Sequence, residues 1–227
     1  SVKRILFPCN ELLQYYEKEN YKLPKKKLNV VYNSCQIAEA INRSNGNDNV
    51  FIIGYIGRLV SLKRLHLLIE LGKQFKENGL KNWEIWIVGD GPELQNLTRL
   101  TAKNNMGDKV VFHGFQSDTL SYYKKFDVFA LPSEEEVLSL ALIDAMVMGI
   151  PSVAFNVGGN AEIIIHGQTG YIVETKEAFF QRIIELFENS SLRESMSDKA
   201  LKTGYSRFSQ DARDSKLKSL YTEIING

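Results

Sequence analysis

Several charged residues follow apolar runs of this sequence at a spacing that suits an anionic, hydroxyl-rich ligand. Arg58 and Lys63 flank the start of the helix predicted from residue 62, with Arg58 in the turn predicted at residues 56–61. Two cations there, with the partial positive charge of the helix start, fit a diphosphate. Glu136 and Asp144 are eight residues apart, on roughly the same side of a loop and helix, where each carboxylate could bind vicinal hydroxyls. Taken alone, both pairs are also typical of solvated helix charges.

Two glycine-containing turns follow other apolar runs. Gly89-Asp90-Gly91-Pro92 resembles a nucleotide-binding turn, but it lacks the GxGxxG pattern and the Lys and Ser or Thr of a P-loop. It predicts either contact with a base or ribose, or a tight strand-to-helix turn with Asp90 as a local cap. The second turn, Gly158-Gly159, allows close approach of a ligand to the backbone and precedes Glu162. Its alternative interpretation is a simple turn followed by an acid at a helix N-terminus.

The sequence contains no pattern typical of a metal site or of a hydrolase nucleophile. The histidines, His66, His113 and His166, are not spaced as metal ligands, and no DxD-type motif or GxSxG elbow is present. Cys9 and Cys35 form no CxxC pair and are expected to be reduced thiols of a cytoplasmic protein. We therefore expect neither a metal ion nor a cofactor.

The composition excludes two broad classes of function. The chain of 227 residues has a formal net charge of +1, which provides no basic field for nucleic acid. No apolar stretch approaches the roughly 20 residues that a membrane-spanning helix requires, and no signal peptide begins the sequence. Because the first residue is Ser rather than Met, we expect the sequence to be part of a longer protein.

The motifs lie on a regular alternation of predicted strands and helices. Apolar runs predict strands at residues 50–55, 83–88, 110–112, 128–131, 152–155 and 170–173. Helical spacing predicts helices at residues 62–78, 93–105, 120–126, 140–148, 176–189 and 192–205. This alternation predicts an α/β fold with a doubly wound, Rossmann-like parallel sheet. Since ligands bind at the carboxyl ends of such strands, the loops that carry the motifs are expected along one edge.

The two ends of the sequence stand apart from this alternation. Residues 11–19 predict a helix, residues 22–27 a Lys-rich turn and residues 29–32 a short strand. The polar residues 44–49 predict a flexible connection, and residues 212–225 predict a final amphipathic helix.

In order and spacing, the motifs resemble the C-terminal, donor-binding domain of the group 1 glycosyltransferases, retaining enzymes with two facing Rossmann-like domains (the GT-B fold). The resemblance extends from about residue 29 to the end of the sequence. The matching residues are Gly57-Arg58-Leu59 with Lys63, Val88 to Pro92, Pro132-Ser133 with Glu136 and Asp144, Ala145-Met146 with Gly149 and Pro151, and Gly158-Gly159 with Glu162. The sequence departs from the family's pattern at Asp144, where a longer Glu is usual, and at Val137-Leu138-Ser139, where glycines are usual.

The resemblance implies a donor site for a nucleoside-diphosphate sugar. Arg58 and Lys63 would hold the diphosphate and neutralise the leaving group, and Glu136 would contact the sugar hydroxyls, which makes these three the implied catalytic residues. Asp144 would contact the ribose, and backbone N–H groups near Ser139 and Leu140 would help to bind phosphate. The whole implied donor site consists of Gly57, Arg58, Lys63, Gly89, Glu136, Ser139, Leu140 and Asp144. The implied reaction is metal-independent transfer, with retention, to an acceptor hydroxyl.

The resemblance also implies how the chain is divided. Residues 1–28 would lead in from an absent N-terminal domain, residues 29–208 would form the nucleotide-sugar-binding domain, and residues 209–227 would form a helix that crosses back. The absent domain would bind a saccharide or lipid-linked acceptor in polysaccharide or glycolipid synthesis, so this fragment is expected to be inactive alone. The Lys-rich turn would be either solvated, the interpretation we favour, or in contact with anionic lipid at the inner face of the membrane in the full-length protein.

Two other functions are open for the same residues. A nucleotide-sugar epimerase on this scaffold would bind the same donor without an acceptor, and the acid-x7-acid spacing favours the transferase over it. A non-catalytic interaction module is supported only by the departures at Asp144 and Val137, and it predicts no nucleotide binding.

Overall fold

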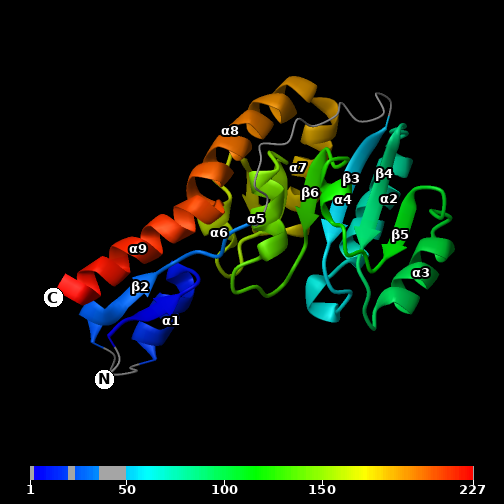
Figure 1. Cartoon of the computed structure of the whole chain (residues 1–227). Coiled ribbons are helices and arrows are strands. Elements are labelled where there is room, and N and C mark those ends of the chain that lie inside the picture. Colours follow the sequence, from blue (N-terminus) through cyan, green and yellow to red (C-terminus); the bar gives the residue numbers. More distant parts are fainter. Residues whose placement is uncertain (1–2, 20–23, 36–49, 227) are drawn as a thin grey trace.

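Six parallel strands form the main sheet of the protein, in the order β5-β4-β3-β6-β7-β8 (Figure 1). The structure is a computed structural model that describes residues 3–19, 24–35 and 50–226. The strands of this sheet are β3 (Phe51–Ile56), β4 (Trp83–Val88), β5 (Val110–Gly114), β6 (Val128–Leu131), β7 (Ser152–Phe155) and β8 (Gly170–Val173). The strands β6 and β7 are buried at every position because helices cover both faces of the sheet, which is typical of a parallel sheet, whereas the edge strand β5 is only partly buried. The predicted α/β fold with a doubly wound parallel sheet is confirmed.

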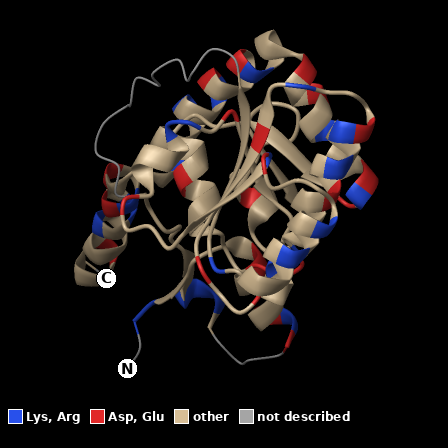
Figure 2. Cartoon of the chain, turned by 90° about the vertical axis from the view of Figure 1, so that its right-hand side faces the viewer, with Lys and Arg blue, Asp and Glu red and all other residues tan. Residues whose placement is uncertain are grey.

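The helices divide between the two faces of the main sheet. One face carries α2 (His66–Glu77), α3 (Leu94–Lys103) and α7 (Lys176–Glu188). The other carries α4 (Leu120–Tyr123), α5 (Leu140–Val147), α6 (Asn160–Ile163) and α8 (Ser190–Phe208). Charged residues of both signs lie along the helices around the sheet (Figure 2). Among the helices that the structure describes, none combines the length and the apolar character that a membrane crossing requires.

Some element boundaries differ from the prediction for identifiable reasons. The chain after β3 first forms a short 3-10 helix, η2 (Ser61–Lys63), and Arg64 then adopts a left-handed conformation with φ of 49°. A left-handed residue interrupts a right-handed helix, so α2 begins at His66 rather than at residue 62. The predicted helix at residues 120–126 ends earlier, at Tyr123, and continues as a turn in which the Phe126 amide donates to the Tyr123 carbonyl.

A second sheet of two parallel strands lies beside the end of the chain (Figure 1). Its parts are β1 (Ile5–Phe7), α1 (Asn10–Lys18), η1 (Lys25–Lys27) and β2 (Leu28–Val30), which we call the lead-in unit. The sequence did not predict β1, and the boundary predicted at residue 29 falls inside β2. The predicted connection at residues 44–49 lies outside the described residues.

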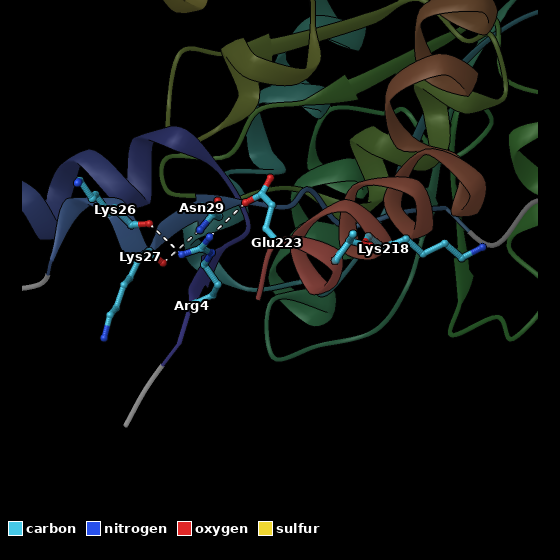
Figure 3. A network of polar contacts seen from close by, with 7 residues as sticks. Arg4, Lys26, Lys27, Asn29, Lys218 and Glu223 are labelled. Atoms are coloured by element: carbon cyan, nitrogen blue, oxygen red, sulfur yellow. Dashed lines mark hydrogen bonds and ion pairs between the residues drawn. The ribbon is translucent and has the colours of Figure 1, made fainter. Parts of the chain in front are cut away.

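The final helix, α9 (Gln210–Asn226), lies beside the lead-in unit. Arg4 joins them: its guanidinium donates to the Glu223 carboxylate and to the Lys26 carbonyl, each over 3.2 Å (Figure 3). The chain therefore leaves the main sheet after α8 and ends against its own beginning.

Gly54 offers a test of the packing in the main sheet. A Cβ at Gly54 would lie 2.1 Å from Cδ2 of Phe126, whereas a Cβ at Gly107 would have no neighbour within 4 Å. We expect Gly54→Ala to lower the free energy of unfolding by about 1–3 kcal/mol, because the buried ring must move. Urea denaturation measures this change, with Gly107→Ala as the control that should be nearly neutral. Equal stability of the two variants would contradict the packing described here.

Candidate functional site

The loops that carry the motifs meet at the carboxyl edge of the main sheet. The chain runs outward from β3 through β4 to β5, and then returns to β6 on the other side of β3. In open α/β sheets, such a reversal of strand order leaves a crevice outside the carboxyl ends of the two diverging strands, and ligands bind there. Here the loop after β3 and the loop after β6 border that crevice.

An ion pair joins these two loops. Nζ of Lys63 lies 2.5 Å from Oε1 of Glu136, and the two side chains are only 18% and 10% exposed. The loops also share a backbone hydrogen bond, because the Glu134 amide donates to the Leu62 carbonyl over 2.8 Å. The structure therefore brings together the cation predicted for the diphosphate and the carboxylate predicted for the sugar.

Two arginines belong to the same loop as Lys63. Arg58 has an exposed side chain, and its carbonyl accepts a hydrogen bond from the Tyr55 hydroxyl over 3.0 Å. Burial, aided by the Glu136 carboxylate, raises the pKa of Tyr55, so the phenol stays neutral and can donate. The Arg64 guanidinium lies 4.7 Å from the ring centre of Phe155, the last residue of β7. The sequence analysis did not single out Arg64, although its place directly after Lys63 was a signal.

The loops after β3 and β4 pack backbone against backbone. A Cβ at Gly89 would lie 1.9 Å from the Gly57 carbonyl oxygen, so only glycine permits this approach. The Leu59 amide donates to the Asp90 carbonyl over 2.9 Å, and the Asp90 side chain accepts from the Gly91 amide over 2.7 Å. Asp90 thus stabilises the turn locally, whereas α3 itself begins at Leu94 and has no side-chain cap.

The loop after β7 packs in the same way on the loop that carries Glu136. Gly158 has φ of 53°, and a Cβ there would lie 1.8 Å from the Glu136 carbonyl oxygen. Its neighbour Gly159 donates its amide hydrogen to the Val137 carbonyl over 2.8 Å. Gly158 therefore lies against the backbone of Glu136, while Lys63 holds its side-chain carboxylate.

The N-terminus of α5 follows shortly after Glu136 in the chain. Ser139 is its N-cap, and Oγ of this buried residue accepts a hydrogen bond from the Leu142 amide over 3.3 Å. Leu140, the first helical residue, is exposed. Helix geometry leaves the first N–H groups without an intrahelical acceptor, so the start of α5 can offer backbone donors to an anion.

Asp144 lies one turn further along α5 and has a partner of its own. Its carboxylate accepts a hydrogen bond from the Cys35 thiol, while burial raises the pKa of the carboxyl group. Among the contacts of the described residues, none joins Asp144 to the Lys63–Glu136 pair. The spacing could not show this, because Cys35 lies far from Asp144 in the sequence.

Two further candidates, His113 and Glu162, have partners outside the crevice. His113 lies between the rings of Trp86 and Tyr122, with ring centres at 4.7 and 4.9 Å, and burial lowers its pKa. Within the described part of the chain, no group of His, Cys, Asp and Glu could hold a metal ion. Glu162 directs its carboxylate at α1 rather than into the crevice.

Comparison with known proteins identifies a family. The family described as group 1 glycosyl transferases matches residues 36–203. N-acetyl-alpha-D-glucosaminyl L-malate synthase of Bacillus anthracis is 30% identical over 144 residues, which are 63% of this chain and 38% of the relative. The capsular polysaccharide biosynthesis glycosyltransferase CapM of Staphylococcus aureus is 30% identical over 186 residues, 79% of this chain and 47% of the relative. The chain thus spans less than half of the length of these curated relatives.

A solved structure shares the fold. Anabaena Alr3699/HepE in complex with UDP superposes with a TM-score of 0.88 at 19% identity, over 97% of this chain and 64% of that one. Such an identity shows the fold alone, which is that of the GT-B glycosyltransferases.

Gly158 offers a test of the loop packing at the site. We expect Gly158→Ala to lower the free energy of unfolding more than Gly167→Ala, by a further 1–3 kcal/mol or so. Both glycines have positive φ, so both variants carry the cost of about 1–2 kcal/mol for a left-handed alanine, but only at Gly158 would the Cβ meet backbone. Urea denaturation of the two variants measures the difference. Equal losses would show that the Glu136 loop does not rest on Gly158.

Proposed function

The chain belongs to the group 1 glycosyl transferases, and on this premise we propose that it is the donor-binding domain of a glycosyltransferase that uses a nucleoside-diphosphate sugar. The observation that carries the proposal is the ion pair between Lys63 and Glu136 in the crevice between β3 and β6. A cation and a carboxylate held together there match the two chemically different halves of such a donor, its diphosphate and its sugar.

In the proposed complex, the donor separates the ion pair and provides a new partner for each of its members. Lys63 turns to the diphosphate, and Glu136 accepts hydrogen bonds from sugar hydroxyls. This exchange is most favourable when both charges find partners, because a half-broken buried pair leaves one charge uncompensated and so weakens binding. A nucleoside diphosphate without the sugar therefore satisfies Lys63 but not Glu136.

The proposed transfer depends on the stabilisation of negative charge on the leaving diphosphate. Lys63, Arg58 and the N–H groups at the start of α5 would supply positive charge around the leaving diphosphate, and groups already in place before the reaction lower the barrier as charge develops. These groups suffice for a reaction without a metal ion. The acceptor hydroxyl would attack on the face from which the diphosphate leaves, which retains the configuration of the sugar.

The ribose contact of Asp144 is part of the same proposal. A carboxylate has two oxygens with about four lone-pair sites, so the Cys35 thiol leaves acceptor capacity for a ribose hydroxyl. Gly57 and Gly89 contribute to the proposed donor site through their backbones, because their close contact packs the loop after β4 against the turn after β3.

The wider reaction is also a proposal. The name of the relative CapM supports a role in polysaccharide or glycolipid synthesis, and UDP in the HepE structure supports a UDP-sugar donor. The saccharide or lipid-linked acceptor would bind to a second domain that includes the lead-in unit and α9. We therefore expect this chain alone to bind the donor without transferring the sugar.

Removal of either cation tests the phosphate site. We expect Lys63→Ala and Arg58→Ala each to weaken UDP binding by about tenfold to a hundredfold, since a hydrogen bond to a charged group contributes about 1.5–3 kcal/mol. Isothermal titration calorimetry without added metal measures the dissociation constants. Arg99→Ala, which removes an exposed cation on α3, is the control that should bind UDP as the unchanged chain does. Unchanged affinity in both site variants would refute the assigned phosphate contacts.

Removal of the carboxylate should have the opposite effect on UDP. In Glu136→Gln, Lys63 loses the anionic partner that it has among the described residues, so we expect UDP to bind about three- to tenfold more tightly, which corresponds to about 0.7–1.4 kcal/mol. The matched control is Glu135→Gln, which removes an exposed carboxylate one residue away. Weaker UDP binding in Glu136→Gln than in the control would mean that Glu136 does not compete for Lys63.

A further inference from the structure

Glu162, in α6, caps a helix that lies about 150 residues earlier in the chain. Its Oε1 accepts from the Glu11 amide over 2.9 Å, and its Oε2 accepts from the Asn10 amide over 2.9 Å. Oε2 also accepts from the Asn10 side chain over 2.6 Å and from the Tyr32 hydroxyl over 2.9 Å. Cys9, the N-cap of α1, provides no side-chain cap of its own. The N-terminus of α1 is therefore capped by a carboxylate from the main domain.

The segment before Glu162 is the loop that fixes the Glu136 backbone. Gly159 contacts both the loop that carries Glu136 and the lead-in unit. Its amide donates to the Val137 carbonyl, and a Cβ at Gly159 would be 3.1 Å from Cβ of Cys9. The Cys9 thiol donates to the same Val137 carbonyl over 3.4 Å. Residues 158–162 thus connect the loop between β6 and α5, which carries Glu136 and which we call the donor loop, to the lead-in unit through direct contacts.

The main domain holds Glu162 in place from behind. Nη2 of Arg207, in α8, donates to the Glu162 carbonyl over 2.7 Å, and the same guanidinium lies 5.6 Å from the ring centre of Tyr32. The titratable groups around the carboxylate are Cys9 and Glu11 at the start of α1, Tyr32 after β2, and Arg207. Burial alone would raise the pKa of Glu162, but the hydrogen bonds from Asn10, Glu11 and Tyr32 together lower it.

We propose that Glu162 is a positioning residue that ties the lead-in unit to the donor loop, so that nucleotide binding and the seating of the lead-in unit favour each other. The seating rests on the observed contacts alone, whereas the coupling to nucleotide also rests on the proposed function. The contact at Gly158 leaves no free space, so a change in the Glu136 loop is passed on to residues 158–162. Coupling of this kind is reciprocal, and either partner can report it.

Hydrogen exchange of the whole chain, followed by mass spectrometry, tests the proposal with Glu162→Gln. A glutamine presents one acceptor oxygen and an NH2 group to donors, so part of the cap is lost. Without nucleotide, we expect exchange at residues 3–19 to be at least threefold faster in this variant, with β3, β4, β6 and β7 unchanged. Glu188→Gln, at the exposed end of α7, is the matched control. Unchanged exchange at residues 3–19 would overturn the proposal.

UDP provides the readout that a merely structural cap would not change. In the unchanged chain and the control, we expect saturating UDP to slow exchange at residues 133–142 and also at residues 3–19. In Glu162→Gln, we expect UDP to slow only the former. Equal slowing of residues 3–19 in all chains would overturn the coupling. If UDP slows exchange nowhere in the unchanged chain, the proposed function and the coupling both fail. The comparison of exchange at residues 3–19 without nucleotide still tests whether Glu162 holds the lead-in unit in place.

The pH dependence tests the same carboxylate without a variant. A carboxylate with a lowered folded-state pKa stabilises its contacts above its ordinary value of 4.5, and this contribution is lost as pH falls through the folded-state value. After correction for intrinsic rates, we expect exchange at residues 3–19 to accelerate below about pH 4.5, before the main sheet does. In Glu162→Gln this step should be absent. A simultaneous acceleration of both regions would contradict the assignment.

Discussion

The ion pair between Lys63 and Glu136 is the interaction on which the candidate site depends. It bridges the two loops that diverge where the strand order reverses, and it holds opposite charges in a place with little access to water. A hydrophobic contact would close the crevice permanently, whereas an ion pair can be opened by a ligand that brings a partner for each charge. The ion pair thus keeps the two loops ordered without ligand and still allows a ligand to replace each charged partner.

Glycine contacts make this arrangement rigid. Gly89 lies against Gly57, and Gly158 lies against Glu136, each at a distance that excludes any side chain. Loops packed through their backbones have few alternative conformations, so the charged side chains at the crevice project from fixed points. The contacts continue through Gly159 to Glu162, and the Glu162 carboxylate binds the start of α1. This chain of contacts joins the loop that carries Glu136 to the lead-in unit.

The sequence predicted what depends on local pattern and missed what depends on contacts between distant segments. Strands of a parallel sheet are rich in apolar residues, so β4, β6, β7 and β8 have the predicted bounds. The three-residue β1 and the four-residue α6 are too short to show a period. The hydrogen-bond donors to the Asp144 and Glu162 carboxylates lie more than 100 residues away in the sequence, and no spacing could reveal them. The late start of α2 follows from the left-handed Arg64, a conformation that sequence alone rarely indicates.

Backbone amide chemical shifts of the ¹⁵N-labelled chain, recorded during titration with UDP and without metal, test the central claim most directly. The account predicts that the largest shifts occur at residues 57–64, 89–91, 133–142 and 157–159, which surround the crevice between β3 and β6. Amides that stay unshifted there at millimolar UDP, or shifts that cluster at another surface, would contradict it.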